Sequence, residues 1–184
     1  MSAALQAPEQ EATFDPKLFR DVMGHFATGV TVVSYHCDGE ARGMTANAFM
    51  SVSLTPPLAL ISVRRAARFA AVVPVGDRFG VNFLLESQQA LSNHFGGRPL
   101  AEITEGASLF EDHHGTPLLR GSLAQLVLRT VDVHTAGDHL LYIGQVEHMV
   151  LGAERKPLVF YSGAYKQVNI HAAPALFWSG NEGW

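Results

Sequence analysis

Short segments rich in β-branched and other apolar residues recur along the chain, and turn signals rather than long helices separate most of them. Such segments favour strands, and the Asp38-Gly39 pair between two of them favours a tight hairpin. The strands expected from this pattern cover residues 30–36, 42–48, 58–63, 78–85, 118–134, 139–151 and 157–161. Because strands and helices do not alternate regularly, the pattern predicts a mainly β, antiparallel barrel with short flanking helices, and not a doubly wound parallel sheet.

Three short helices are expected beside these strands. The first begins with Asp15-Pro16, a capping residue followed by a first-turn proline. Apolar residues recur behind it with helical spacing, at Phe19, Val22, Met23 and Phe26. Residues 65–73 and 87–95 are the other two, and a polar connection over 96–117 follows. The expected organisation is a flexible lead over 1–13, one domain over 14–168 and a tail over 169–184.

The composition of the chain limits the cellular compartment and the kinds of binding partner to be expected. Hydrophobic residues make up 47% of the 184 residues and charged residues only 16%, which predicts that apolar surface is hidden in an oligomer. The formal net charge of -4 and the scattered arginines give no support to nucleic-acid binding. No apolar run approaches the ~18 residues of a membrane span. The start of the chain lacks the features of a signal peptide and Cys37 is the single cysteine, so a cytoplasmic protein is expected.

Several kinds of catalytic chemistry find no support in the sequence. The nine histidines lack metal-ligand spacing, and the adjacent His113 and His114 point apart on an extended chain, so no metal is expected. The Gly-x-Ser-x-Gly elbow of serine hydrolases is missing. The glycine patterns of nucleotide-binding loops are missing too.

The stretch GMTANAFMSVSLTPPLALISV, residues 43–63, contains no Asp, Glu, Lys, Arg, His or Cys. Hydroxyl and amide groups alternate in it with small and apolar residues, at Thr45, Asn47, Ser51 and Ser53. Such groups suit a planar ligand that approaches the backbone and takes hydrogen bonds. A hairpin whose hydroxyls bind their own backbone is the interpretation that composition alone favours. The residues alone leave both interpretations open.

Five blocks, in order, resemble the short-chain flavin reductase family. They are FRDVMGHFATGVTVV, GMTANAFMSVSLTPPLALISV, FGVNFLLESQQALSNHFGG, GDHLLYIGQV and PLVFYSGAYKQV, between about residues 19 and 168. The resemblance implies a homodimeric FMN-binding split barrel of Greek-key topology. It also implies an NAD(P)H:flavin oxidoreductase that transfers hydride from NADH or NADPH to FMN or FAD. Reduced flavin then serves a partner flavin-dependent monooxygenase.

The resemblance also implies a role for individual residues. His139, in Gly137-Asp138-His139, corresponds to the family's nicotinamide contact and is the expected catalytic residue, orienting the ring rather than acting as a base. The expected cofactor-binding residues are Thr45, Ala46 and Asn47 at the flavin ring, Ser51 and Val52 at the ribityl side, Ser62 with the residues up to Phe69 at the phosphate, Asn82 and Phe83 beside the flavin, and Tyr161 and Tyr165 at the nicotinamide side.

Two positions depart from the family pattern. Ala67-Arg68-Phe69 replaces the usual Ser-x-Thr that meets the flavin phosphate, so Arg64, Arg65 or Arg68 is expected to bind the phosphate instead. Ser162 and Ala164 stand where basic residues or histidine are common, which weakens the case for recognising the extra phosphate of NADPH. The alternatives are a non-catalytic split-barrel protein that binds flavin or haem, and a barrel with a purely structural role.

Overall fold

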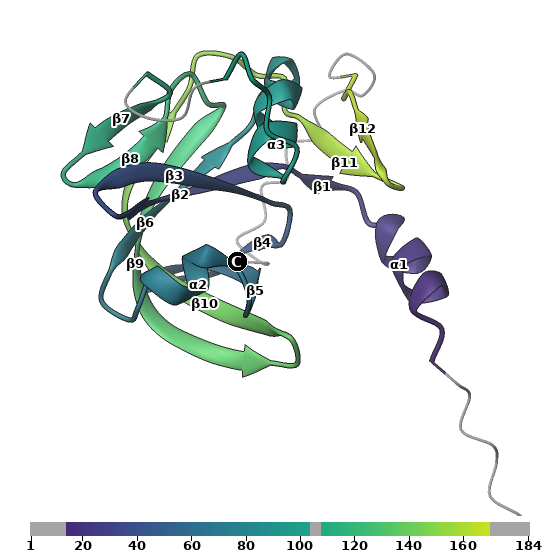
Figure 1. Cartoon of the computed structure of the whole chain (residues 1–184), viewed down its shortest axis with the longest axis horizontal. Helices are drawn as coiled ribbons and strands as arrows, with labels where there is room; N and C mark the ends of the chain where they lie inside the picture. The colour runs from purple at the N-terminus through teal and green to yellow at the C-terminus, as the bar shows by residue number, and fades with distance from the viewer. Residues whose placement is uncertain (1–13, 104–107, 170–184) are drawn as a thin grey trace, which may run out of the picture.

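A seven-stranded antiparallel sheet forms the body of the protein (Figure 1). The computed structural model describes residues 14–103 and 108–169, so the predicted lead over 1–13 and nearly all of the predicted tail over 169–184 lie outside it. In sheet order the strands are β3 (Glu40–Ala46), β2 (Thr31–Cys37), β6 (Arg78–Phe83), β9 (Ala124–Ala136), β10 (His139–Leu151), β5 (Pro57–Arg64) and β4 (Phe49–Leu54). Every neighbouring pair is antiparallel, which confirms the predicted mainly β, antiparallel fold class.

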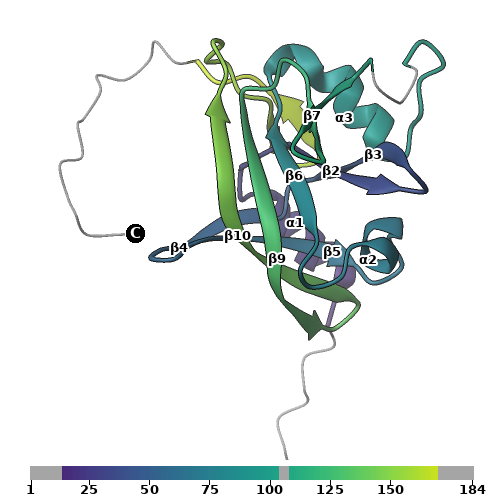
Figure 2. The ribbon, with the colours of Figure 1, turned by 90° about the vertical axis from the view of Figure 1, so that its left-hand side faces the viewer.

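The two edge strands of this sheet, β3 and β4, are consecutive in sequence. Only Asn47 and Ala48 separate them. Since an extended chain advances about 3.6 Å per residue, the two edges approach to within about 11 Å at this link. The sheet therefore has to curl into an open barrel, as Figures 1 and 2 show. Thr31 Oγ1 donates to Ala46 O at 2.7 Å and Ser62 N donates to Ala48 O at 3.0 Å, which fixes the link on both sides.

An aromatic cluster fills the barrel around Phe69. This residue lies on the short helix α2 (Arg68–Val72) and is fully buried. Its ring meets those of Tyr35, Phe79 and Tyr142 edge-on, with centroids 5.0 to 5.4 Å apart. This is the favourable geometry for aromatic pairs. The helix predicted over 65–73 exists but begins later, after the Ala67 turn, and Phe69 anchors it in the core.

A second core lies under α3 (Gln89–Phe95) and beside a small sheet. The 3-10 helix η1 (Glu86–Gln88) precedes α3, and Phe95 packs with Val32, Leu84 and Phe110. The small sheet contains β1 (Thr28–Gly29), β11 (Val159–Tyr161) and β12 (Ala164–Lys166). Figure 1 shows α3 next to β11 and β12, at the side of the barrel where the edge strand β3 ends.

Two sequence-based expectations about residues 96–134 are wrong. The predicted polar connection over 96–117 contains β7 (Phe110–His113), and β8 (Thr116–Leu119) begins within it; these two strands form a hairpin. The single strand predicted over 118–134 is broken between β8 and β9. Gly121 adopts a positive φ of 66° there, and Ser122 Oγ donates to Leu119 O at 2.8 Å, so the chain turns away from the first ladder before it enters the barrel.

The first helix, α1 (Pro16–Gly24), begins as predicted but its apolar face is uncovered. Asp15 accepts a hydrogen bond from Lys17 N at 2.8 Å, which caps the helix. None of its residues is buried, and Figure 1 shows it projecting from the barrel. Phe19, Val22 and Met23 are each more than half exposed. The helical spacing of these residues predicted the helix correctly but gave no information on what covers it.

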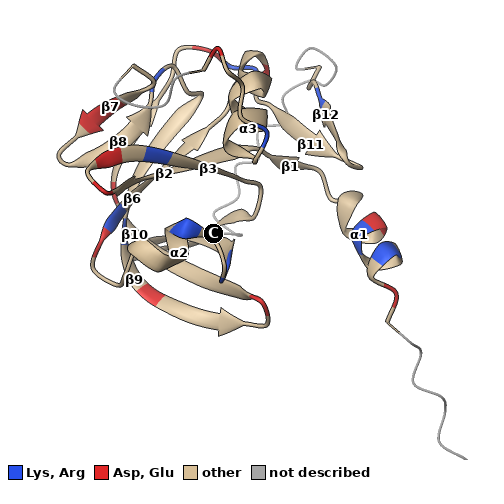
Figure 3. Ribbon diagram, in the orientation of Figure 1, with Lys and Arg blue, Asp and Glu red and all other residues tan. Residues whose placement is uncertain are grey.

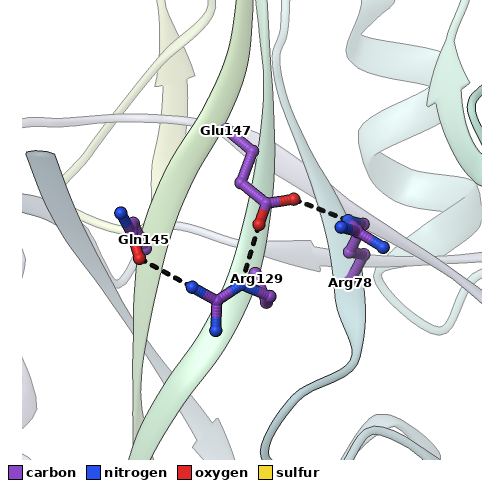
Figure 4. A network of polar contacts seen from close by, with 4 residues as sticks. All are labelled: Arg78, Arg129, Gln145 and Glu147. Atoms are coloured by element: carbon purple, nitrogen blue, oxygen red, sulfur yellow. Dashed lines mark hydrogen bonds and ion pairs between the residues drawn. The ribbon is translucent and has the colours of Figure 1, made fainter.

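A polar network joins three strands on the outer face of the barrel (Figure 4). Glu147 on β10 accepts from Arg78 Nε on β6 at 2.6 Å and from Arg129 Nε on β9 at 2.7 Å. The second nitrogen of Arg129 donates to Gln145 Oε1 at 2.7 Å. The hydrogen bond from Arg78 and then that from Arg129 hold the pKa of Glu147 below its ordinary value. Elsewhere Lys and Arg are dispersed over the described ribbon (Figure 3).

We expect Phe69→Ala to lower the free energy of unfolding by about 3–5 kcal/mol, because it removes an aromatic ring from a closely packed core. Chemical denaturation followed by circular dichroism measures the change. Val75→Ala is the control, since Val75 is 59% exposed and its truncation should change the free energy by less than about 0.5 kcal/mol. Equal effects of the two substitutions would contradict the role given to Phe69.

Candidate functional site

A pocket of about 380 Å³ opens at the corner between β3, α3 and the β11–β12 hairpin. Its size is in the range of small-molecule sites. It is lined by Val30, Thr45, Ala46, Asn47, Ser92, Asn93, Gly96, Arg98, Phe160, Gly163 and Tyr165. One lining residue, Arg98, carries a charge, and the others offer neutral polar groups, backbone or aromatic rings. The pocket therefore suits a ligand with an uncharged, planar, hydrogen-bonding part.

Thr45, Ala46 and Asn47 reach this pocket because they form the end of the edge strand β3 and the link to β4. The outer side of an edge strand has backbone N–H and C=O groups without partners in the sheet, and these can bind a ligand. The Thr45 hydroxyl does not contribute, since Thr45 Oγ1 donates to Ser92 O at 2.7 Å. Asn47 is exposed. The structure thus unites the three residues that sequence predicts at a flavin ring.

Tyr165 forms the opposite wall, and α3 holds its hydroxyl. Tyr165 Oη lies 2.8 Å from Ser92 Oγ and donates to Asn93 Oδ1 at 3.2 Å. Because the Tyr165 hydroxyl donates its one proton to Asn93 Oδ1, Ser92 Oγ is the donor in the shorter bond. Phe160 packs edge-on against the Tyr165 ring, with centroids 5.5 Å apart. The two bonds fasten the β11–β12 hairpin to α3 and fix the width of the pocket.

The end of α3 requires glycine at position 96. A Cβ atom there would lie 2.8 Å from Ser92 O, closer than a side chain can approach. Gly96 N donates instead to Ser92 O at 3.0 Å and to Asn93 O at 3.2 Å, which closes the helix. The chain can then bend at Gly97, where φ is 90°. Both glycines therefore shape the pocket without contributing a side chain.

A second group of predicted residues lies at the start of β10, outside this pocket. His139 is opposite Arg64 in the β5–β10 ladder, and Arg65 N donates to Asp138 O at 3.0 Å. The His139 side chain is 35% exposed, and its Nδ1 lies 2.8 Å from Asp138 Oδ1. This hydrogen bond is the main cause that holds the pKa of Asp138 below its ordinary value. His139, Arg64 and Arg65 thus form one group, separate from the pocket residues.

Other predicted residues are spread over the surface near these two groups. Ser51 and Val52 are exposed on the edge strand β4, and Ser62 is half-buried on β5. Arg68 is exposed at the start of α2. Tyr161 is exposed, and its ring packs edge-on against His25 with centroids 5.9 Å apart.

The Asn82 side chain, predicted beside the flavin, does not line the pocket. It is fully buried, and both its amide nitrogen and its amide oxygen form hydrogen bonds within the protein. Asn82 Nδ2 donates to Val32 O at 2.8 Å and to Ser34 Oγ at 2.9 Å, and Asn82 Oδ1 accepts from Leu119 N at 2.8 Å. The amide thus joins β2, β6 and β8 beside the second core, on the face of β6 opposite the aromatic cluster. Its neighbour Phe83 is half-buried and packs against Phe49 of β4, with ring centroids 5.1 Å apart.

Sequence reasoning missed the part of the pocket that comes from α3 and the β11–β12 hairpin. Ser92, Asn93, Arg98 and Phe160 all line it and none was predicted. The signal available was the polar pair Ser92-Asn93 within an expected helix, followed by Gly96-Gly97. Residues 14–103 and 108–169 hold no group of three or more His, Cys, Asp or Glu side chains placed to bind a metal ion. Within the same ranges, no helix is long and apolar enough to span a membrane.

Comparisons with known proteins agree in pointing to one family. The sequence pattern of the flavin reductase like domain matches residues 23–169. The chain is 40% identical over 150 residues to the reductase component of 4-hydroxyphenylacetate 3-monooxygenase from Thermus thermophilus, covering 82% of this chain and 95% of that protein. It is 37% identical over 167 residues to an NADH-dependent flavin reductase from Rhodococcus sp, covering 89% and 93%.

A solved structure gives the same result for the fold. The flavin reductase PheA2 superposes with a TM-score of 0.77 at 41% sequence identity, over 84% of this chain and 99% of that one. The similarity covers β3, α3 and the β11–β12 hairpin because the matched domain extends over residues 23–169, and so it includes the whole pocket. The chain therefore belongs to the flavin reductase-like family.

Proposed function

We propose that the protein is an NADH:flavin oxidoreductase that reduces FMN or FAD and passes the reduced flavin to a partner monooxygenase. The observation that carries this proposal is the mostly neutral pocket on the edge strand β3, where Thr45, Ala46 and Asn47 line one side. The names of two relatives support the activity and the destination of the product: one is an NADH-dependent flavin reductase, and the other is the reductase component of a monooxygenase. Ser162 and Ala164 supply no cation for the extra phosphate of NADPH, so we propose NADH as the donor.

The residues of the pocket fit a flavin ring by the chemistry of their donors. Edge-strand backbone groups of β3 and the exposed Asn47 amide offer hydrogen bonds to the polar edge of a flat ring, and Phe160 and Tyr165 offer apolar surface. Flavin and reduced nicotinamide, when bound, would supply the hydride-transfer chemistry through their own ring systems. The chain then has to orient the rings and exclude water, and no acid or base is required of the pocket. This agrees with the lining of the pocket, which contains no Asp, Glu or His among the described residues.

His139 and the neighbouring arginines at the start of β10 also have roles in this proposal. We assign His139 to orientation of the nicotinamide, with Asp138 holding its Nδ1. Arg64, Arg65 and Arg68 are the proposed cations for the flavin phosphate, since each is exposed and none has a side-chain hydrogen bond or ion pair among the described residues. Ser51, Val52 and Ser62 are assigned to the ribityl chain between the two groups, and Tyr161 to the outer nicotinamide side.

We also propose that the working form is a homodimer in the cytoplasm. Exposed apolar residues lie on α1, directly beside it in sequence and on the edge strand β4, and they are Phe14, Leu18, Phe19, Val22, Met23, Phe26, Met50, Val52 and Leu54. Monomeric proteins seldom expose so many large apolar side chains together. A second copy of the chain is the occupant that the low charged fraction of 16% favours. The free thiol of Cys37 supports a reducing compartment.

The purified protein should oxidise NADH at a rate that depends on added FMN or FAD. Loss of absorbance at 340 nm measures the rate, and a reaction without flavin is the control. Riboflavin, FMN and FAD compared under the same conditions identify the preferred acceptor. A protein that binds flavin or haem with a fixed visible spectrum and oxidises no NADH would instead support the non-catalytic alternative.

Tyr165→Phe should lower the free energy of unfolding by about 1–2 kcal/mol, because Ser92 and Asn93 lose their shared partner. The turnover number should stay within about twofold, since no proton of Tyr165 takes part. Tyr161→Phe is the matched control, because the Tyr161 hydroxyl has no hydrogen bond among the described residues, and its effect on stability should stay within about 0.5 kcal/mol. A hundredfold loss of turnover in Tyr165→Phe would contradict the purely structural role of Tyr165 in the pocket wall.

The double substitution Leu18→Glu/Val22→Glu should shift the dimer toward monomer by at least tenfold in dissociation constant, because it places two like charges on the apolar face of α1. Sedimentation velocity over a concentration series measures this constant. Val75→Glu is the control on an exposed apolar position away from α1 and β4. A wild-type protein that sediments as a monomer at all concentrations would refute the dimer.

A further inference from the structure

Among the described residues, Arg98 is the one charged residue that lines the pocket, and the fold gives it a fixed backbone position. α3 ends at Phe95, Gly96 caps it, and Gly97 turns the chain with a φ of 90°. Arg98 N then donates to Asn93 O at 3.0 Å, which brings residue 98 back beside the last turn of α3. Asn93 is the same residue that accepts a hydrogen bond from Tyr165. The backbone of Arg98 is therefore tied to the wall of the pocket.

The guanidinium of Arg98, in contrast, is uncommitted. The residue is exposed, and among the described residues its side chain has no hydrogen bond or ion pair. Arg78, Arg120 and Arg129 each pair with a carboxylate. An arginine that lines a pocket without a side-chain partner among the described residues has five N–H donors available in a geometry that matches phosphate.

The surroundings of this cation would otherwise disfavour an anion. The last carbonyl groups of α3, Ser92 O and Asn93 O, lie at this side of the pocket, and the carboxyl end of a helix carries partial negative charge. The chain as a whole has a net charge of -4. A negatively charged ligand group can approach this corner favourably only where a local cation compensates, and Arg98 is the lining residue that does so.

We propose that Arg98 binds a phosphate group of the ligand whose uncharged ring occupies the pocket, and that it sets the preference for phosphorylated ligands over ring-only ones. This rests on the proposed reductase function, and it adds a cation that lies apart from Arg64, Arg65 and Arg68, none of which lines the pocket. The phosphate belongs either to the flavin nucleotide or to the pyrophosphate of NADH. The shared chemistry is a phosphate attached to a flat, neutral ring system.

Binding measurements on the full chain test this without relying on turnover. Isothermal titration of the wild type, Arg98→Gln and Arg98→Lys uses two matched ligand pairs: FMN with riboflavin, and NADH with reduced nicotinamide riboside. Arg98→Gln should weaken one phosphate-bearing ligand by about tenfold or more, as expected for loss of a charge-assisted hydrogen bond, and leave its ring-only counterpart within about twofold. The pair that responds identifies the source of the phosphate. Arg98→Lys should restore part of the affinity, because it restores the charge without the planar fork.

Salt dependence separates a charge contact from a structural effect. Affinity of the wild type for the responding ligand should fall as ionic strength rises, and the affinity of Arg98→Gln should fall less steeply. Arg155→Gln is the matched control, since Arg155 is an exposed arginine whose side chain contacts Gly152 O and lies outside the pocket.

The outcomes that overturn the proposal are distinct from those that overturn the reductase function. Unchanged affinities in Arg98→Gln, or equal losses for both members of a pair, refute the phosphate contact while leaving the reductase function intact. A wild type that binds neither flavins nor reduced nicotinamides refutes both.

Discussion

The shape of the protein depends on one covalent constraint: two residues, Asn47 and Ala48, join the two edge strands of a seven-stranded sheet. A flat sheet would put those edges at opposite sides, so the connection curls the sheet and brings both edges to one corner. Edge strands are normally a liability because their outer backbone groups are unpaired. In this fold the same unpaired groups of β3 line the pocket, and so the constraint that shapes the barrel also makes its binding surface.

The remaining walls come from segments that tertiary bonds bring to that corner. Thr45 binds the carbonyl of Ser92, and Tyr165 binds Ser92 and Asn93, so that β3, α3 and β12 are fastened to one another by three hydrogen bonds. At the other end of the barrel, Phe69 anchors α2 in the aromatic core and thereby positions the exposed Arg68 beside it. Pocket walls and core packing thus share short elements such as α3, which supplies Phe95 to the second core and Ser92 and Asn93 to the pocket.

Local patterns predicted the antiparallel strands, the Asp38-Gly39 hairpin and the start of α1 at Asp15-Pro16, because each depends on neighbours in sequence. The break between β8 and β9 was missed because one glycine within a β-rich run does not reveal a turn. Family resemblance located Thr45, Ala46 and Asn47, which do line one pocket. It did not reveal Ser92, Asn93 or Arg98, which reach the pocket only through the packing of α3. The burial of the Asn82 side chain was missed because a polar residue on a strand looks the same in sequence whether it faces a ligand or the core.

The buried Asn82 amide has a consequence for how the barrel selects its pairing. Its bonds reach β2 through Val32 and Ser34 and β8 through Leu119, so both its donor and its acceptor sides are in use. A slip of β6 by one residue would turn this side chain to the opposite face, and would leave its partners, Leu119 N among them, without a bond in the interior. An apolar residue of the same size would tolerate such a slip. The single amide therefore favours one register over the alternatives. In the observed alignment of β2, β6 and β8, every buried polar group that the amide contacts has a hydrogen-bond partner.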